Sequence, residues 1–191
     1  MKSLYINTTE KNLILGFKDG EKFFVSESSS EHQQSEIIFS DMEKILDGNK
    51  VSDLDFIVCL GGPGAFTGIR LGLSIVKGFN IALGIPVITL NNFMASFYSL
   101  PKQKDDFYIA ISSGMNELFV SKFSPDGNVL EEGKLVKKEE FNPDCKVFLN
   151  LKINPEMVLL QVEKNFDKEK FVQEEIKPTY IKPHYAKVKA K

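Results

Sequence analysis

A strand pattern, a glycine-rich loop and a long helix of small residues follow one another between residues 55 and 90. No other stretch restricts the fold as strongly. Residues 55–60 (DFIVCL) form a continuous apolar run of strand length, as expected for a strand buried on both faces. After the loop, the sequence predicts a helix over 67–83 that ends at Gly84, and a second strand over 86–90. A strand, a crossover helix and a second strand form a parallel, right-handed unit.

The preceding segment predicts an antiparallel sheet and one helix. A short apolar run at residues 3–9 is followed by a hairpin with strands at 12–17 and 22–27, joined by a glycine-containing turn. Apolar residues at i, i+4 and i+7 predict a helix over 30–46. Three antiparallel strands before a parallel unit are the order of a ribonuclease-H-like or actin-like lobe. The predicted fold class is therefore α/β, a mixed sheet with helices.

A second, reduced lobe is predicted after Pro101. Strands over 107–112, 117–123 and 128–132 read as a meander. The run KVFLNL, residues 146–151, could add a strand. The predicted organisation is an N-terminal lobe at 1–100, a second lobe at 101–165, and a charged segment with a lysine-rich tail at 166–191.

Residues 154–166 are ambiguous. Asn154 and Pro155 could begin a helix, whereas the valines that follow suit a strand. Residues 164–176 are rich in charge and are expected to be exposed.

Composition excludes several classes of protein. The chain has 191 residues and a net charge of −2, so the whole molecule is not an electrostatic trap for nucleic acid. Its two cysteines, Cys59 and Cys145, cannot form a disulfide framework, and Cys59 is expected to be a buried thiol. No signal peptide or membrane-spanning run is predicted, and a cytoplasmic location is expected by default.

The glycine loop matches neither specific nucleotide motif. A P-loop requires Lys and Ser or Thr after its last glycine, whereas Gly68 is followed by Ile69. The dinucleotide fingerprint requires G-x-G-x-x-G with an acid about twenty residues on, whereas here the spacing is longer and the acid is missing. Free N–H groups at a helix start could still hold an anion. The candidate loop residues are Gly62, Gly64, Phe66, Thr67 and Gly68.

The predicted helix over 67–83 carries glycines at positions 72 and 78. Each costs about 1 kcal/mol relative to alanine, so a close approach of another backbone is the expected compensation. Two apolar stripes predict packing on two sides, one on the sheet and one on the 30–46 helix or a partner. Arg70, Ser74 and Lys77 form a polar seam at i, i+4, i+7, which is either solvated or the rim of a helix–helix interface.

Residues needed for independent catalysis are missing from the sequence. His32 and His184 are far apart, so a histidine metal motif is impossible, and no nucleophile triad can be assembled. Actin-like ATPases end their first strand with Asp, whereas this chain has Asn7, a weaker Mg²⁺ ligand. Glu117 is the single acid of the ISSGMNE hairpin. The chain is therefore expected to have no catalytic or metal-binding residues of its own.

The stretch GGPGAFTGIRLGLSIVKGFNIALGIPVITLNNF resembles the TsaB (YeaZ) family. The family pattern is roughly G-P-G-S-F-T-G-[LI]-R-[IL]-G, then K-G-L and G-[IV]-P, and Ala65 replaces its usual Ser. Looser matches are QSEIIFSDMEKIL, which keeps Ser35 and Glu36, and PTYIK near the end, with Tyr180. Asn7 and the ISSGMNE hairpin depart from the family pattern. The matching loop and helix residues are Gly62, Pro63, Gly64, Phe66, Thr67, Gly68, Ile69, Arg70, Leu71, Gly72, Lys77, Gly78, Gly84 and Pro86.

The resemblance implies a non-catalytic accessory subunit for threonylcarbamoyl transfer to adenosine 37 of tRNAs that read ANN codons. It implies pairing with the transferase TsaD and work with the ATPase TsaE, with a homodimer possible for the chain alone. The resemblance implies that ATP and a divalent metal are bound in the partner complex. It also implies that the chain contacts tRNA only through that complex and does not bind a membrane. The implied partner-interface residues are Ser35, Glu36, Ile38, Met42, Ile69, Arg70, Gly72, Leu73, Ser74, Lys77 and Gly78.

Two alternatives stay open from the residues alone. The chain could be a nucleotide-binding phosphotransferase or ATPase of the actin-like superfamily that uses the glycine loop. The lysine-rich tail, which includes Lys182 and Lys191, could contact tRNA or could be a solvated end.

Overall fold

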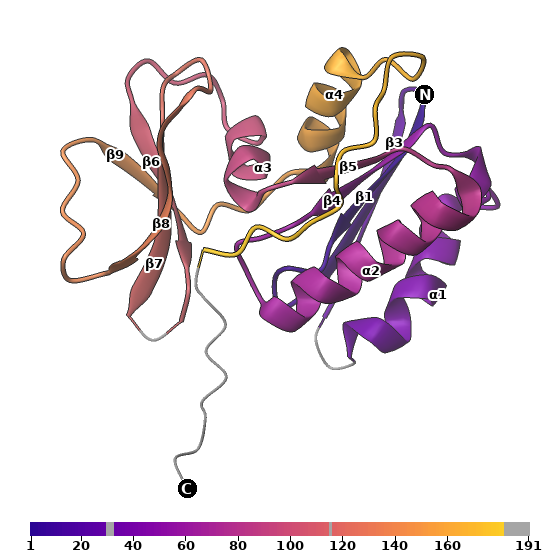
Figure 1. The fold of residues 1–191 in the computed structure, drawn as a ribbon, viewed down its shortest axis with the longest axis horizontal. Coiled ribbons are helices and arrows are strands. Elements are labelled where there is room, and N and C mark those ends of the chain that lie inside the picture. The colour runs from indigo at the N-terminus through magenta and orange to yellow at the C-terminus, as the bar shows by residue number, and fades with distance from the viewer. Residues whose placement is uncertain (30–32, 115, 182–191) are drawn as a thin grey trace, which may run out of the picture.

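The computed structural model describes residues 1–29, 33–114 and 116–181, which form two lobes side by side (Figure 1). His32, His184 and the lysine-rich tail from Lys182 onward lie outside the described residues, so the predictions for them stay predictions. The first lobe is built on a five-stranded sheet of order β3-β2-β1-β4-β5. The strands are β1 (Lys2–Asn7), β2 (Leu13–Asp19), β3 (Lys22–Ser28), β4 (Phe56–Leu60) and β5 (Val87–Leu90).

The pairing of these strands confirms the predicted topology. β1 runs antiparallel to β2 and parallel to β4, β2 runs antiparallel to β3, and β4 runs parallel to β5. The continuous apolar run that predicted a doubly covered strand is fully buried as β4. The mixed sheet is the one expected of an actin-like or ribonuclease-H-like lobe.

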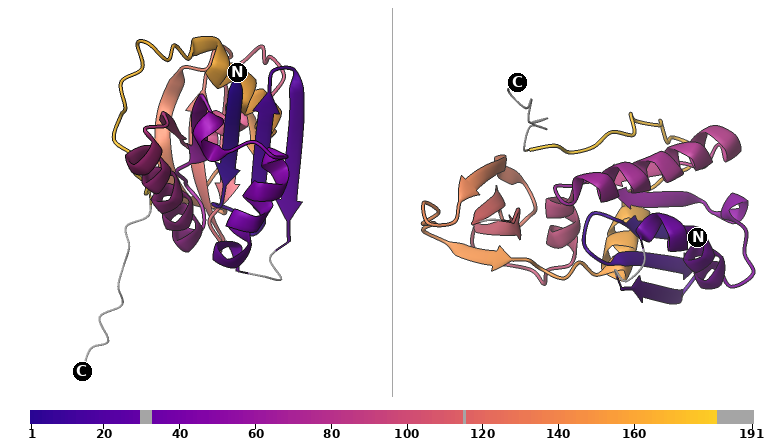
Figure 2. Two further views of the ribbon diagram at one scale, coloured as in Figure 1. Left: turned by 90° about the vertical axis from the view of Figure 1, so that its right-hand side faces the viewer. Right: turned by 90° about the horizontal axis from the view of Figure 1, so that it is seen from below.

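Helices cover both faces of this sheet, as Figure 2 shows from two further directions. One face carries α1 (Gln34–Leu46) and α2 (Phe66–Leu83), whose apolar residues share one core with β1, β2 and β4. The predicted helix over 30–46 is thus described from Gln34 onward. The other face carries α3 (Asn92–Tyr98) and α4 (Pro155–Asn165). A short 3-10 helix, Val51–Asp53, precedes β4.

Asparagine caps begin both helices of this second face. The Asn91 side chain accepts a hydrogen bond from the Met94 N–H and so caps the start of α3. Asn154 accepts from the N–H groups of Glu156 and Met157, with Pro155 in the first turn. The ambiguous segment 154–166 is therefore a helix, because its start offers a cap and a proline.

The second lobe is a four-stranded sheet of order β8-β7-β6-β9, in which β9 pairs parallel with β6. Its inner face packs against α3, where Phe97 stacks on Phe107 and Phe123. The meander is confirmed, with β8 longer than predicted because its pairing with β7 continues to Lys137. The strands are β6 (Phe107–Ser112), β7 (Glu117–Phe123), β8 (Val129–Lys137) and β9 (Lys146–Leu149).

The chain returns to the first lobe earlier than the predicted boundary at residue 165. Ile153, Val158 and Leu159 are buried against Tyr5 and Phe56 of the first sheet, so α4 belongs to the first lobe. The second lobe is therefore reduced to its four strands and their connections. Sequence alone could not place α4, because an amphipathic helix fits either sheet.

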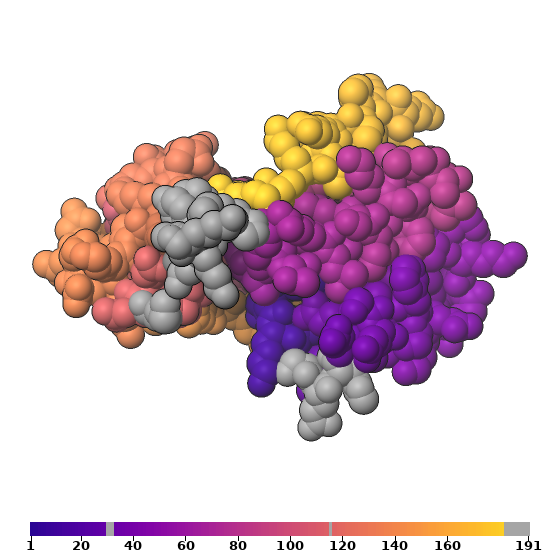
Figure 3. All heavy atoms as spheres, turned by 60° about the horizontal axis from the view of Figure 1, so that its bottom comes forward, coloured from indigo at the N-terminus to yellow at the C-terminus, as the bar shows by residue number. Residues whose placement is uncertain are grey.

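Residues 166–181, which we name the strap, follow α4 without regular secondary structure. The strap lies on the surface beside α2 and reaches the second lobe (Figure 3). Most of residues 164–176 are exposed, as expected, whereas Phe166 packs on Phe56 at 4.6 Å between ring centroids and the half-buried Ile176 packs against the core under α1 and α2. Apolar residues spaced through a charged segment explain this difference.

α2 also meets the length and composition criteria for a helix that could cross a membrane, contrary to the expectation that no run is long enough. Core helices pass the same criteria. In α2 the residues Ile69, Leu73 and Val76 are buried against the first sheet, whereas Ile81 and Leu83 are exposed, so burial explains only part of its apolar character.

Candidate functional site

The glycines of the loop and of α2 lie against the chain's own β1–β2 connection. A Cβ atom on Gly64 or Gly68 would overlap the carbonyl oxygen of Thr9 or Thr8, respectively. A Cβ on Gly72 would lie 2.5 Å from Thr8 Oγ1 and 3.2 Å from Cys59 Sγ. Gly72, where a close approach was predicted, is approached by the side chains of Thr8 and Cys59 within the same chain rather than by a backbone. A backbone approaches closely at Gly64 and Gly68, where it is that of Thr9 and Thr8.

Gly78 differs from the other glycines of this stretch. A Cβ at Gly78 would have no atom within 4 Å, so nothing in the described chain requires a glycine there. The predicted close approach at Gly78 is therefore absent within the described chain.

A buried polar network holds the loop to the end of β1. Asn7 Oδ1 accepts hydrogen bonds from Thr9 N–H at 2.9 Å and from Thr9 Oγ1 at 2.8 Å, and Asn7 Nδ2 donates to Glu10 Oε1 at 3.0 Å. Asn92 Nδ2 donates to Thr9 Oγ1 at 2.6 Å, and Asn92 Oδ1 accepts from Gly62 N–H at 3.2 Å. Asn7 and Asn92 are 0% and 2% exposed, so these amides are occupied by structural bonds.

The hydrogen bonds at the end of β1 affect whether Asn7 could bind a metal ion, and a charged group nearby affects the pKa of Tyr5. Asn7, which we compared with the metal-ligating Asp of actin-like ATPases, has both its side-chain oxygen and its side-chain nitrogen hydrogen-bonded within the chain. Burial, and then the charge of Glu10, raises the pKa of Tyr5 well above its ordinary value. Among the described residues, no three His, Cys, Asp or Glu side chains are grouped to hold a metal ion.

Both cysteines are free thiols. Cys59 is buried in β4, as predicted, and burial raises the pKa of its thiol to about 12. A thiol with such a pKa stays protonated at neutral pH, so Cys59 is a packing residue rather than a nucleophile.

A cleft of about 950 Å³ lies between the lobes. The loop and the start of α2 form one wall, and the second sheet with Ile111 and Phe119 forms the other. Among its lining residues, Glu10 and Lys11 carry charge, and the walls are mostly apolar. The cleft has the volume of a small-molecule site. Its lining includes a single positively charged side chain, that of Lys11, whereas a polyphosphate carries several negative charges.

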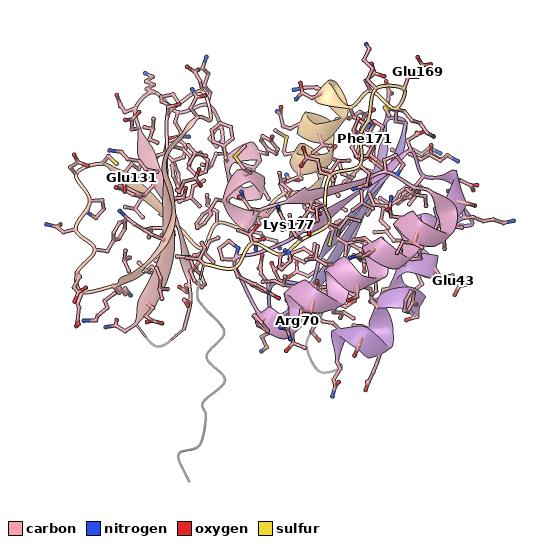
Figure 4. All side chains as sticks on the ribbon, in the orientation of Figure 1. Glu43, Arg70, Glu131, Glu169, Phe171 and Lys177 are labelled. Atoms are coloured by element: carbon pink, nitrogen blue, oxygen red, sulfur yellow. The ribbon has the colours of Figure 1, made fainter. Side chains whose placement is uncertain are left out.

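Three side chains meet at the mouth of this cleft. The Tyr180 ring of the strap stacks on Phe66 with centroids 4.7 Å apart, and the Arg70 guanidinium lies 3.9 Å above the Phe66 ring. Arg70 Nε donates to Tyr180 Oη at 3.2 Å. Arg70 lies at the end of α2 that is nearer the second lobe (Figure 4). The resemblance marked Tyr180 without a role, and no spacing in the sequence predicts that it meets Arg70.

The predicted interface residues divide into a buried and an exposed set. Five of them pack in the core under α1 and α2, where they hold the helices to the chain's own sheet rather than face a partner. These are Ile38, Met42, Ile69, Gly72 and Leu73. The exposed set is Ser35, Glu36, Arg70, Ser74, Lys77 and Gly78.

Exposed apolar side chains lie beside that polar set. Phe39 on α1 is 58% exposed, and Ile81 and Leu83 on α2 are 75% and 49% exposed. Phe39 and Leu83 continue the apolar periodicity of their helices. The helical period places them at the stripe edges, where only the structure distinguishes core from surface.

The fold is that of an actin-like protein, and the Asn7 side chain at the end of β1 is hydrogen-bonded within the chain. A family model described as "TsaD: tRNA N6-adenosine threonylcarbamoyltransferase" matches residues 26–177. The chain belongs to this family.

Relatives within the family agree with the TsaB (YeaZ) resemblance. The chain is 29% identical over 107 residues to the tRNA threonylcarbamoyladenosine biosynthesis protein TsaB of Haemophilus influenzae, which covers 54% of this chain and 45% of that protein. It is 34% identical over 87 residues to the tRNA N6-adenosine threonylcarbamoyltransferase of Cytophaga hutchinsonii, covering 44% of this chain and 25% of that protein. The chain thus spans less than half the length of these curated relatives.

A solved structure shows the same fold over nearly the whole chain. YeaZ from Pseudomonas aeruginosa superposes with a TM-score of 0.73 at 15% identity, covering 94% of this chain and 99% of that one. The second, smaller lobe is therefore part of a shared architecture.

Proposed function

We propose that this chain is an accessory subunit in the biosynthesis of threonylcarbamoyladenosine at adenosine 37 of tRNAs that read ANN codons. It acts by pairing with the threonylcarbamoyltransferase TsaD and supporting it. The family membership and the TsaB relatives supply the pathway in this proposal. The pairing surface comes from the geometry of α1 and α2.

One observation carries the pairing proposal: the outer face of α2 is apolar or small where nothing in the described chain covers it. Gly78 has open space above its Cα, and Ile81 is 75% exposed one turn further along. Phe39 presents a ring on the outer side of α1. Small residues beside exposed apolar side chains allow a second helix to approach closely and bury them.

The buried network at Asn7 supports a non-catalytic role. The Asn7 side-chain oxygen already accepts two hydrogen bonds within the chain and is a weaker ligand for Mg²⁺ than a carboxylate. ATP and a divalent metal are accordingly assigned to the partner complex. TsaE, the ATPase of the pathway, is a further proposed partner.

Light scattering on the purified chain, alone and mixed with TsaD from the same organism, tests the pairing. We expect a stable 1:1 complex, and the chain alone also reveals whether it forms a homodimer. No complex at micromolar concentrations, with TsaD itself folded, would reduce the resemblance to one of fold and pathway.

Two matched variants locate the interface. Gly78→Phe places a ring on the open face of α2 and should abolish the complex while the chain stays folded, because no atom of the described chain lies within 4 Å of a Cβ at this position. Lys138→Phe places the same ring on an exposed position of the second lobe and should leave the complex intact. Equal effects of the two variants would argue against α2 as the interface. Bulky changes at Gly72 are unsuitable, because they meet Thr8 and Cys59.

ATP turnover distinguishes the alternative phosphotransferase function. Saturable hydrolysis by the chain alone, lost in Arg70→Ala, would favour that alternative and overturn the non-catalytic role. Turnover at background level is the expected outcome.

A further inference from the structure

The strap joins three parts of the molecule within a few residues of its end. The Thr179 N–H donates to the Gly61 carbonyl of the glycine loop at 2.8 Å. Tyr180 stacks on Phe66 and accepts a hydrogen bond from Arg70 Nε on α2. Ile181 packs in the core of the second lobe with Phe93. Successive residues of one segment therefore contact the loop, the helix and the other lobe.

The contacts of Arg70 link the exposed face of α2 to Tyr180 of the strap. Its Nε is held by Tyr180 and its guanidinium plane lies on Phe66, while the side chain as a whole is exposed. A guanidinium presents five N–H donors in a rigid fork, so the bond to Tyr180 leaves further donors for a carboxylate of a partner. A partner that binds those donors fixes Arg70, and Arg70 in turn fixes Tyr180.

We propose that Tyr180 is a positioning residue that couples the outer face of α2 to the cleft between the lobes. An acidic group on the partner that engages Arg70 locks the strap, and the strap holds the second lobe through Ile181. Because coupling between two events is reciprocal, a locked strap also raises the affinity of Arg70 for that partner. This inference rests on the proposed pairing through α2, and it assigns the regulation of that surface to the strap.

The isolated chain gives the first test, which is independent of the partner. Hydrogen exchange at the Thr179 amide reports whether the strap is docked. Arg70→Gln and Tyr180→Phe each remove the Arg70–Tyr180 bond, and we expect each to speed this exchange by about three- to tenfold. Lys77→Gln removes a positive charge from the same helix face, and because no hydrogen bond or ion pair between Lys77 and the strap is described, it should leave the exchange unchanged. Wild-type exchange in Arg70→Gln, or equal acceleration in Lys77→Gln, would overturn the proposal.

The second test adds TsaD as the probe. Complex formation should slow exchange at Thr179 in the wild-type chain, and Tyr180→Phe should both abolish that protection and weaken the complex. Lys77→Gln should keep the protection in whatever complex it forms. Absence of any complex with the wild-type chain would overturn the proposed function and this coupling together. A complex that forms while Thr179 exchanges as before would overturn the coupling alone.

Discussion

Thr8 and Gly68 are in contact through backbone and side chain, although 60 positions separate them in sequence. Thr8 Oγ1 donates a hydrogen bond to the Gly68 carbonyl at 2.7 Å, and a Cβ on Gly68 would overlap the Thr8 carbonyl oxygen. The first turn of α2 is thereby fixed against the end of β1. Since the loop and the strap both attach at this end, the contact also fixes the mouth of the cleft.

Gly68→Ala should be strongly destabilising for this reason. We expect it to lower the free energy of unfolding by about 3 kcal/mol, because a backbone oxygen cannot yield as a flexible side chain would. Gly78→Ala is the matched control on the same helix, and it should raise stability by roughly 0.5–1 kcal/mol, since alanine is the better helix former in open space. Denaturant unfolding of both variants measures the difference, and similar values for the two would contradict the close approach.

The sequence predicted most of the first lobe. The buried run at β4, the stop signals after α2 and the hairpin glycine fix elements by local rules, and these do not depend on the rest of the chain. Local rules also predicted that the glycines permit a close approach. They could not name Thr8 as the approaching residue, because that contact depends on how distant segments pack.

The surface of the candidate site was harder to predict for a related reason. Helical periodicity separates the two sides of a helix but not the edges of its apolar stripe. Ile38 and Met42 were expected at an interface and are core residues, whereas the neighbouring Phe39 is exposed. The return of α4 to the first sheet was likewise invisible, since its apolar side would fit either lobe.

Asn7→Asp tests the structural role of the buried amide. The change removes the donor to Glu10 and places a carboxylate beside it, so we expect a loss of about 2 kcal/mol of stability at pH 7. Burial and the Glu10 charge would raise the pKa of the new carboxyl in the folded state. The loss should therefore shrink as pH falls and the group becomes protonated.

Asn12→Asp is the surface control for this prediction. Asn12 also donates to a glutamate, Glu27, but in an exposed hairpin where water replaces the bond. Its effect should stay within about 0.5 kcal/mol. Chemical denaturation of both variants between pH 5 and pH 8 provides the comparison. An Asn7→Asp variant as stable as the wild-type chain across this range would show that the position tolerates a metal-ligating side chain.

Gln173 should hold the middle of the strap on the edge of the first sheet. Its side-chain amide accepts from the Val87 N–H and donates to the Val87 carbonyl, each at 2.9 Å, which reproduces the pairing of a neighbouring strand. Gln173→Glu keeps the acceptor but loses the donor, so we expect about 1 kcal/mol less stability and faster exchange at the Val87 amide. Gln161→Glu on α4 is the control, because no hydrogen bond of that side chain is described. Unchanged exchange at Val87 would mean that the middle of the strap is held by its apolar residues rather than by Gln173.

Asp41 should make the attachment of α1 dependent on pH. The Ser28 hydroxyl donates to Asp41 Oδ2, and this bond, with a smaller contribution from Lys44, lowers the pKa of the Asp41 carboxyl against the opposing effect of burial. A carboxyl whose pKa is lower in the folded state adds stability above its unfolded value of about 3.9, and that stability is lost as pH falls through the folded pKa. Asp41→Asn should thus cost roughly 1 kcal/mol at pH 7 and progressively less below about pH 4.

Glu43→Gln, at an exposed position on the same helix, should change stability by less than about 0.5 kcal/mol at pH 7. Unfolding titrations of the three proteins from pH 7 to pH 3 decide the matter, since a cost for Asp41→Asn that stays constant with pH would place its origin in packing rather than in charge.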